Sequence, residues 1–528
     1  MSKEYSNIRL SSQTILRAAA CLALALFICL FAAQSASAAN FVVTTTADSG
    51  AGSLRAAIAT ANTNAQADTI TFNIASGSAG CTDLVCTITL TSGELAVIDD
   101  GAGNTLTINA AGTNQVTISG NNTSRVFFVK QFANLTLNGL TITKGNGTGT
   151  TNSLNNNSGG GIISFGTLTL TNSTVSGNST RFGGGIDSDN GITTLTNSTV
   201  SGNTATNFGG GIYKGGAAAM TLVNSTVSGN TAFSGGGIYN TGNNHMTLTN
   251  STVSGNTAEY VGGIQNDAST LNLTSVTVTK NQSTLPRNCG ANCIGGISTS
   301  FGTVNLKNTI VAGNTVADAT SSPDFRGSIA AGSAYNLIGN GQGMGGIANN
   351  DANHNQVGVD AKLAPLANNG GATQTHALLF GSPALDKGSS FTLTTDQRGA
   401  GFTRPVNLPD ATYPNATGGN GADIGAFEAA LGTTAATVSV SGRVVTAQGR
   451  GIRNVVITMM DSSGNTRTAT STAFGYYRFE EVEAGQVYIF TARGKRFSFD
   501  ENSQVHSIIG DTNDINFVAS ERTVFSVN

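Results

Sequence analysis

Few residues in this 528-residue chain have side chains suited to acid–base chemistry. Charged residues make up 10% of the sequence, and between residues 140 and 314 the carboxylates are Asp187, Asp189, Glu259 and Asp267. Asp187 and Asp189 are two positions apart, so on a β-strand both side chains point to the same face. Glycoside hydrolysis uses such a pair, with the carboxyl groups about 5 to 9.5 Å apart. The same spacing is also common in solvated turns, and the neighbouring cations are scattered along the sequence.

The four histidines are the other candidates for proton transfer: His245, His354, His376 and His506. No serine or cysteine nucleophile motif accompanies them, so we interpret each as structural or exposed. The sequence therefore predicts no catalytic residue, no metal site and no cofactor. Whether the protein is an enzyme stays uncertain at this point, with a non-enzymatic role favoured.

The candidate ligand-binding residues directly follow an isoleucine that recurs along the sequence. The position after that isoleucine is occupied in turn by Ile163, Asp187, Tyr213, Tyr239 and Gln265. Tyr213 and Tyr239, one repeat apart, could form a stacking platform for a sugar, with Asp187 as a polar neighbour. The alternative is that the two tyrosines merely stabilise a sheet by stacking on each other.

The elements that position these residues follow from an internal repeat. The string Asn-Ser-Thr-Val-Ser-Gly-Asn begins at Asn172, Asn197, Asn224 and Asn250, in steps of 25, 27 and 26 residues. A second, glycine-rich string ends in isoleucine at 162, 186, 212, 238, 264 and 297. Thr, Val, Ser and Asn dominate each repeat, which favours short strands over helices. Each repeat therefore predicts one coil of a solenoid whose strands stack about 4.8 Å apart.

The columns of apolar residues predict a bend inside each coil. Leu170 and Val175 are both expected in the core. They are five positions apart, and residues separated by an odd number of positions on a straight strand point to opposite faces. Asn172 and Ser173, between them, are turn residues. We expect the stacked asparagines at this bend, and a second set at Asn178, Asn203, Asn230 and Asn256, to form hydrogen-bonded ladders. The glycine runs suit a sharp corner.

The N-terminal part of the chain carries two further signals. Residues 1–38 have basic residues, an apolar run and Ala36-Ser37-Ala38, which predicts a cleaved signal peptide rather than a membrane anchor. The stretch Ser53–Asn62 predicts a helix that caps the open end of the solenoid. No other segment is apolar enough to span a bilayer, so no transmembrane segment is expected in the mature chain.

Export would place the cysteines that follow the predicted signal peptide in an oxidising compartment. They form two close pairs, Cys81 with Cys86 and Cys289 with Cys293. We predict two local disulfides. A zinc site formed by both pairs is the alternative, but the pairs lie about two hundred residues apart and their spacings are loose.

Several of these strings resemble a known group of proteins. Phe41 to Asn62 resembles the N-terminal motif of bacterial secreted right-handed parallel β-helix proteins, and the repeats resemble those of polymorphic outer membrane proteins. Leu363–Gly388, Thr395–Arg398 and Asp423–Glu428 resemble the choice-of-anchor Q region. The resemblance implies a surface or extracellular β-helix of the pectate-lyase-like type. A sorting anchor usually follows this region, and none is visible here, which leaves the mode of attachment open.

The last 98 residues differ in composition, with 18 charged residues against 37 in the preceding 430. Ser441–Val444, Gly451–Val455 and Gly475–Tyr477 are similar to carboxypeptidase regulatory-like domains, which are small transthyretin- or Ig-like β-sandwiches. Phe474 stands where that family often has Asp. We therefore predict an all-β chain with a signal peptide (1–38), a capped parallel β-helix (39–350), a choice-of-anchor Q-like capping region (351–430) and a β-sandwich (431–528).

Composition limits the functions that this chain could have. A net charge of −3 and few cations make it a poor match for nucleic acid. We predict an exported cell-surface or extracellular protein with a structural or adhesive role, whose partner is a polysaccharide or another cell-surface component. The alternative is a polysaccharide lyase or glycoside hydrolase on the same fold, because fold alone does not decide function.

Overall fold

The structure is a computed structural model. It describes residues 38–63, 66–98, 105–111, 115–147, 157–285, 293–317, 322–379, 381–408, 413–430, 437–461, 464–483, 486–495, 497–499, 502–508 and 511–521. The predicted signal peptide lies outside these residues, except for Ala38.

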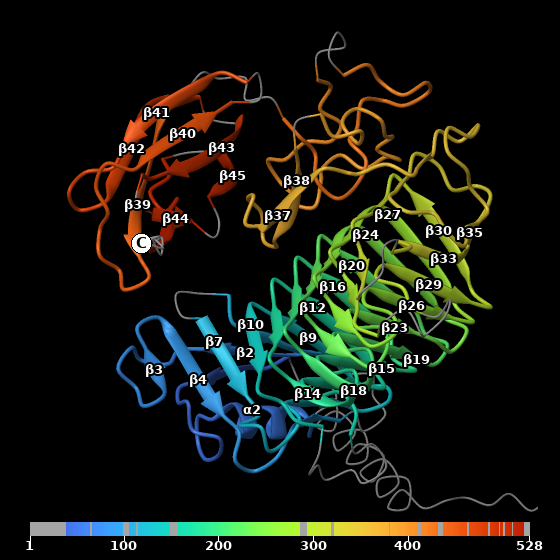
Figure 1. The fold of residues 1–528 in the computed structure, drawn as a ribbon. Coiled ribbons are helices and arrows are strands. Elements are labelled where there is room, and N and C mark those ends of the chain that lie inside the picture. The colour runs from blue at the N-terminus through green and yellow to red at the C-terminus, as the bar shows by residue number, and fades with distance from the viewer. Residues whose placement is uncertain are drawn as a thin grey trace, which may run out of the picture.

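Most of the chain forms a right-handed parallel β-helix, followed by a separate β-sandwich, and this confirms the predicted fold class (Figure 1). The first sheet contains β1 (Asn40–Val43), β2 (Asp68–Phe72), β3 (Cys81–Thr82), β4 (Val85–Thr89), β6 (Thr105–Asn109), β7 (Gln115–Ser119), β9 (Asn134–Asn138), β10 (Leu140–Thr143), β12 (Thr167–Thr171), β13 (Thr174–Ser176), β16 (Thr193–Thr196), β17 (Thr199–Ser201), β20 (Met220–Val223), β21 (Thr226–Ser228), β24 (His245–Ser254), β27 (Thr270–Thr279), β30 (Thr303–Lys307), β31 (Ile310–Val311), β34 (Leu337–Ile338) and β36 (Gln356–Val357).

Two further sheets complete each coil. The second sheet is formed by β5 (Leu95–Val97), β8 (Phe127–Val129), β11 (Ile162–Ser164), β15 (Ile186–Asp189), β19 (Ile212–Gly215), β23 (Ile238–Asn240), β26 (Ile264–Asp267), β29 (Ile297–Ser300), β33 (Phe325–Ser328) and β35 (Met344–Gly345). The third sheet is formed by β14 (Ser179–Phe182), β18 (Thr204–Phe208), β22 (Thr231–Ala232), β25 (Thr257–Ala258), β28 (Gln282–Ser283) and β32 (Thr315–Val316). Stacking in register buries one continuous column of Ile, Leu and Val inside the coils.

The bend predicted inside each repeat is present. Leu170 and Val175 are both fully buried. Asn172 lies between them with φ of 49°, in the left-handed region that asparagine tolerates better than most residues. The equivalent asparagines Asn197, Asn224 and Asn250 have φ of 50°, 51° and 45°. The bend lets one strand segment turn into the next without moving either apolar side chain out of the core.

The glycine corners have two separate causes. Gly183 has φ of 61°, which a residue with a Cβ rarely adopts. Gly184 has no such φ, but a Cβ there would lie 2.4 Å from the carbonyl oxygen of Gly210 in the next coil. Successive coils approach so closely at this corner that no side chain fits between their backbones.

Buried asparagines form a ladder along the β-helix axis. Asn178, Asn203, Asn230, Asn256 and Asn281 each donate from backbone N and side-chain Nδ2 to the Oδ1 of the next asparagine, at 2.8 to 3.1 Å. Asn314 ends the row by donating to Asp324 Oδ1. A more exposed ladder joins Asn197 to Asn172 through a 3.3 Å hydrogen bond. The buried ladder satisfies backbone and side-chain groups that would otherwise be buried without partners.

A short helix, α2 (Leu54–Ala61), covers the N-terminal end of the solenoid. Leu54, Ile58 and Ala61 are buried against the first coils, and the Ser53 side chain accepts a hydrogen bond from the Ala56 N–H as the N-cap. Arg55 donates to the carbonyls of Gly93 and Glu94, which ties the helix to the chain around β5. The helix shields the strand edge that an open solenoid end exposes.

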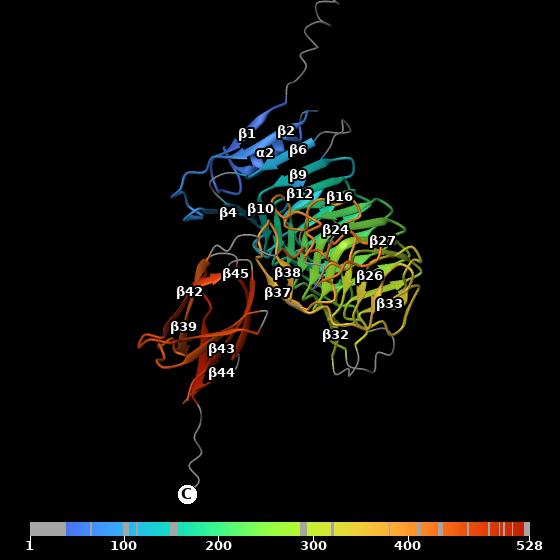
Figure 2. The same cartoon turned by 90° about the horizontal axis from the view of Figure 1, so that it is seen from above.

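Residues 351–430, the capping region, lie along one side of the coils (Figures 1 and 2). Its first strand, β36, still belongs to the first sheet of the coils, and its other regular elements, β37 (Leu363–Ala367) and β38 (Thr375–Leu378), pair antiparallel. Buried side chains reach from it to the repeat: Gln397 accepts from the Thr252 hydroxyl at 2.6 Å, and His376 Nε2 lies 2.8 Å from Ser254 Oγ. His376 is thus held as a structural residue, with its Nδ1 at 2.7 Å from the Ala364 carbonyl.

The C-terminal β-sandwich has its own hydrophobic core. One sheet is formed by β42 (Tyr476–Glu483), β39 (Thr437–Thr446), β46 (Phe517–Glu521) and β44 (Phe497–Phe499). The other is formed by β41 (Thr466–Thr470), β40 (Val456–Met460), β43 (Gln486–Arg493) and β45 (Ser503–Ile508). Phe490 and Phe517 are fully buried between the sheets.

Candidate functional site

The residues proposed for ligand binding lie in one column on the outside of the second sheet. Strand pairing aligns Ile163 with Asp187, Asp187 with Tyr213, Tyr213 with Tyr239, and Tyr239 with Gln265. The isoleucine before each of these positions points into the core and fixes the register. The structure therefore brings Asp187, Tyr213 and Tyr239 together as neighbours on consecutive strands.

Further aromatic side chains, from the third sheet and its following turns, pack against this column. The ring centroids of Tyr213 and Tyr239 are 5.8 Å apart at 15°, and those of Phe208 and Tyr239 are 4.5 Å apart at 27°. The ring centroids of Phe182 and Tyr213 are 5.7 Å apart. We call the whole set the aromatic face; its members are Phe182, Phe208, Tyr213, Phe233, Tyr239 and Tyr260.

The members of the aromatic face that come from the third-sheet side were not predicted from the sequence, although a signal for them exists. Phe182, Phe208, Phe233 and Tyr260 each stand one or two residues before a glycine run, so they recur with the repeat. The glycine corner that follows has no side chains, so the two sheets meet there at close range. Phe233 keeps 38% of its surface exposed, and the other members are partly exposed. Partly exposed aromatic rings gathered on one side of a solenoid are typical of a binding surface.

Polar groups lie along the edge of the aromatic face. The Tyr239 hydroxyl donates to Asp267 Oδ2 at 2.7 Å, and Gln265 Nε2 donates to Asp267 Oδ1 at 2.5 Å. Burial and this hydrogen bond raise the pKa of Tyr239 well above its usual value. Asp189, two residues beyond Asp187 on β15, is partly exposed. The face thus combines aromatic rings with carboxylates, a combination that suits carbohydrate hydroxyls and amines.

Asp187 is the most perturbed group of this site. It is 3% exposed, and its Oδ1 accepts no hydrogen bond from any residue that the structure describes. Burial raises the pKa of Asp187 to about 7, and the nearby charge of Asp189 adds to the increase, while Ser158, Arg125 and Lys214 oppose it. Asp187 therefore changes its charge near neutral pH.

Lys214, the closest buried cation, is already occupied. It is fully buried, and its Nζ donates to the carbonyls of Gly215 at 2.6 Å, Ser188 at 3.0 Å and Gly191 at 3.4 Å. Burial lowers the pKa of Lys214 to about 8, against the opposing effect of Asp189 and Asp187. With its three donors directed at backbone carbonyls, this ammonium stabilises the turn after β15 rather than offering itself to a ligand.

Replacing Asp187 with Asn tests the buried carboxyl directly. Because the folded-state pKa is raised above the unfolded value, the contribution of Asp187 to stability is fully present below the unfolded pKa and is lost as pH rises through about 7. Asn mimics the protonated form. We expect the stability of Asp187→Asn relative to the parent protein to increase by about 3 kcal/mol between pH 5 and pH 9. Denaturant unfolding at both pH values measures this, and a pH-independent difference would contradict it.

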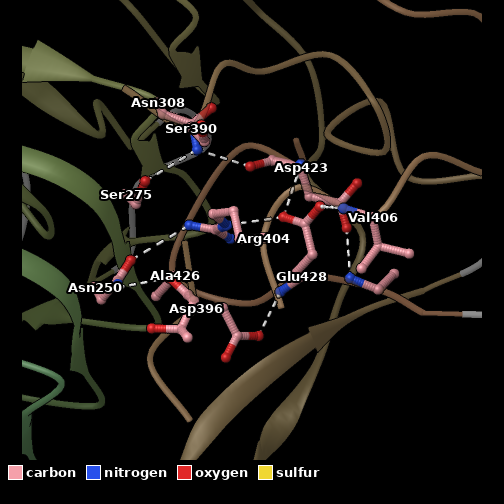
Figure 3. Close-up of polar contacts among 12 residues, drawn as sticks. Asn250, Ser275, Asn308, Ser390, Asp396, Arg404, Val406, Asp423, Ala426 and Glu428 are labelled. Carbon is pink, nitrogen blue, oxygen red and sulfur yellow. Dashed lines mark hydrogen bonds and ion pairs between the residues drawn. The ribbon is translucent and has the colours of Figure 1, made fainter. Parts of the chain in front are cut away.

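A second cluster of ionisable side chains is buried where the capping region meets the coils (Figure 3). Arg404 Nε donates to Glu428 Oε2 at 2.8 Å, and both side chains are almost completely buried. Glu428 also accepts from the N–H groups of Val406 at 2.7 Å and Asp423 at 3.0 Å. Asn308 donates to the Asp423 carbonyl at 2.7 Å, which links the cluster to the solenoid. Since these groups are closed to solvent, we interpret the cluster as a structural clamp and not as a catalytic site.

Burial sets the charge state of the clamp. It raises the pKa of Asp423 well above its usual value, and the charge of Glu428 adds to this effect. Burial also raises the pKa of Glu428, while Arg404 opposes the increase. The Arg404 guanidinium thus forms an ion pair with Glu428, and its charge also opposes the increase in the pKa of Asp423.

The two predicted disulfide sites lie in different parts of the β-helix. Cys293 neighbours the aromatic face, because the N–H of the next residue, Ile294, donates to the Tyr260 carbonyl at 2.9 Å. Cys81 and Cys86 form a disulfide across the antiparallel pair β3–β4. Cys293 is also disulfide-bonded, and Cys289, its predicted partner, lies outside the described residues. Within the described part of the chain, no group of three or more His, Cys, Asp or Glu residues is placed to hold a metal ion. The same residues contain no helix with the length and apolar character needed to cross a membrane.

The C-terminal domain is similar to a known family. Residues 439–520 match the carboxypeptidase regulatory-like domain. Among solved structures, the crystal structure of pectate lyase Pel9A is similar, with 15% identity and a TM-score of 0.43; the match covers 74% of this chain and 97% of that one. No curated protein sequence matches the chain.

Proposed function

We propose that this protein is an exported, non-catalytic β-helix that binds polysaccharide at a cell surface or outside the cell. The observation that supports it is the aromatic face, where partly exposed rings from successive coils lie beside Asp189, Gln265 and Asp267. The rings recur once in each coil, and the ring centroids of Tyr213 and Tyr239 are 5.8 Å apart, so a chain of sugars could contact several coils at once. Apolar ring faces and polar edges are the two features that sugars require.

The alternative function, polysaccharide cleavage, finds less support in this site. Asp187 has the raised pKa of a general acid, but it is 3% exposed, and Lys214 is fully buried. General acid–base catalysis needs a group within hydrogen-bonding reach of the substrate. An assay for new reducing ends or unsaturated products on a panel of polysaccharides tests this alternative, and clear turnover would replace our proposal.

The double variant Tyr213→Ala/Tyr239→Ala tests the binding function. Each stacking contact contributes about 0.5–1.5 kcal/mol, so we expect affinity for a bound glycan to fall by roughly tenfold to a hundredfold. Binding is measured on a glycan array and then by calorimetry with the oligosaccharides that bind.

The matched control for this test is Tyr476→Ala, which removes a tyrosine that is 57% exposed on the C-terminal sandwich. It should bind like the parent protein. Circular dichroism verifies that each variant stays folded, because Tyr239 also packs against Phe208. Unchanged binding by a folded double variant would exclude the aromatic face as the glycan site.

A further inference from the structure

The charge of the aromatic face narrows the class of glycan that it would accept. Asp187 and Asp189 alternate on β15 and so point to the same side of the sheet. Asp187 is paired in register with Tyr213, and both carboxylates raise the pKa of the Tyr213 hydroxyl, after the larger effect of burial. Two acidic groups therefore lie beside one half-buried aromatic ring.

The cations around these carboxylates are engaged elsewhere. Lys214 directs its ammonium at three backbone carbonyls. Arg125 forms a buried ion pair with Glu94 at 2.7 Å. Arg181 is exposed, and its guanidinium lies 5.0 Å from the ring centroid of Phe182, at the edge of the aromatic face. None of the three forms an ion pair with Asp187 or Asp189 among the described residues.

Asp187 supplies an independent sign that a ligand group belongs here. Its Oδ1 is buried and accepts no hydrogen bond from the described residues. An unsatisfied buried acceptor costs about 1–3 kcal/mol, so it is rarely kept in a protein without a reason. A cation placed beside Asp189 would compensate this carboxyl group electrostatically and would favour its ionised form.

We propose that the aromatic face recognises an amino-sugar polysaccharide, whose protonated amine is bound by Asp189 against the ring of Tyr213, with Asp187 as the second carboxylate. This rests on the proposed glycan-binding function and names its ligand class. An ammonium group is attracted both by carboxylates and by the face of an aromatic ring, which explains why the two occur together. The same charges repel polyuronates, whose carboxylates would meet Asp189 and Asp267.

The test compares three oligosaccharides of equal length at pH 6 and low salt: a β-1,4-linked glucosamine hexamer, its fully N-acetylated counterpart and a galacturonate hexamer. We expect the glucosamine hexamer to bind at least tenfold more tightly than the N-acetylated hexamer, and the galacturonate hexamer to bind weakest. Asp189→Asn should reduce the preference for the free amine to about twofold or less, while affinity for the N-acetylated hexamer stays the same. Asp83→Asn, which removes an equal charge from the exposed turn of the β3–β4 hairpin, should keep the full preference.

Other results would overturn the inference in distinguishable ways. Equal binding of the two amino-sugar hexamers, or tightest binding of galacturonate, would leave glycan binding intact and reject the amine site. An equal loss of preference in Asp83→Asn and Asp189→Asn would assign the preference to net charge and not to this site. Failure of all three hexamers, and of the glycan array, would reject the proposed function together with the inference.

Discussion

Replacing Arg404 with methionine is expected to lower the free energy of opening of the capping region by about 3–5 kcal/mol, because it removes the cation from a buried ion pair. Arg404 is 1% exposed, and Glu428, its partner, is equally buried. Methionine fills much of the space of the arginine stem but cannot compensate the carboxylates of Glu428 and Asp423. Hydrogen exchange at the N–H groups of Val406 and Asp423, which donate to Glu428, reports the local opening.

The effect of Arg404→Met should depend on pH. Without the guanidinium, the folded-state pKa values of Glu428 and Asp423 rise further above their unfolded values. Stability contributed by such groups is present at low pH and is lost as pH rises through the folded-state pKa. The variant should therefore differ from the parent protein more at pH 8 than at pH 5.

Two controls separate loss of the ion pair from loss of packing. Arg404→Met/Glu428→Gln removes both charges and should recover much of the stability lost in the single variant, since no unpaired carboxylate remains at Glu428. Arg478→Met breaks an exposed ion pair with Glu480, whose side chains are 56% and 63% exposed, and should change little. If Arg404→Met is as harmless as Arg478→Met, the clamp does not hold the capping region.

The solenoid could be predicted from sequence because its determinants are local and repeated. The bend at the asparagine could be predicted because two columns of apolar residues are separated by an odd number of positions. The prediction requires only that Leu170 and Val175 both be buried, as they are. The glycine corner follows from a string that recurs with the same period. In a parallel solenoid each residue meets its counterpart in the next coil, so a repeat in the sequence becomes a contact in space.

The clamp could not be predicted in this way, because its contacts join residues far apart in the sequence. Arg404 and Asn250 are 154 residues apart, and Asn308 and Asp423 are 115 apart. No period relates these pairs, and the capping region has little regular secondary structure to constrain them. Its string Asp423–Glu428 resembled a known family, but the resemblance did not reveal that Glu428 pairs with Arg404.

The candidate site was predicted in part. The column of Asp187, Tyr213 and Tyr239 follows from the repeat alone, and strand pairing places these residues as expected. The other members of the aromatic face lie on the third sheet or in the turns that follow its strands, and only the fold brings them across the glycine corner. The burial of Lys214 was also beyond sequence reasoning, because a lysine on a strand is ordinarily expected at the surface.

Loss of one asparagine from the buried ladder is expected to destabilise the β-helix strongly. Asn230→Ala is expected to destabilise the β-helix by about 3–5 kcal/mol, because it leaves several buried polar groups without partners at once. Asn230 is fully buried, and its Nδ2 donates to Asn256 Oδ1 at 2.9 Å and to the Val200 carbonyl at 3.0 Å. Its Oδ1 accepts from the backbone and side-chain N–H groups of Asn203 at 2.9 and 3.0 Å. Hydrogen exchange at Asn203 and its neighbouring coils, together with thermal unfolding, measures the loss.

Asn197→Gly is the matched control for the ladder, because it removes an asparagine from the more exposed row. Its side chain makes a 3.3 Å hydrogen bond to Asn172, and glycine tolerates its φ of 50° without strain. We expect a loss below about 1 kcal/mol, since water can replace the exposed hydrogen bond. The two rows repeat with the same period and consist of the same residue, but the side chain of Asn197 is more exposed and forms fewer hydrogen bonds than that of Asn230. Equal losses from Asn230→Ala and Asn197→Gly would show that burial of the ladder is not what stabilises the coils.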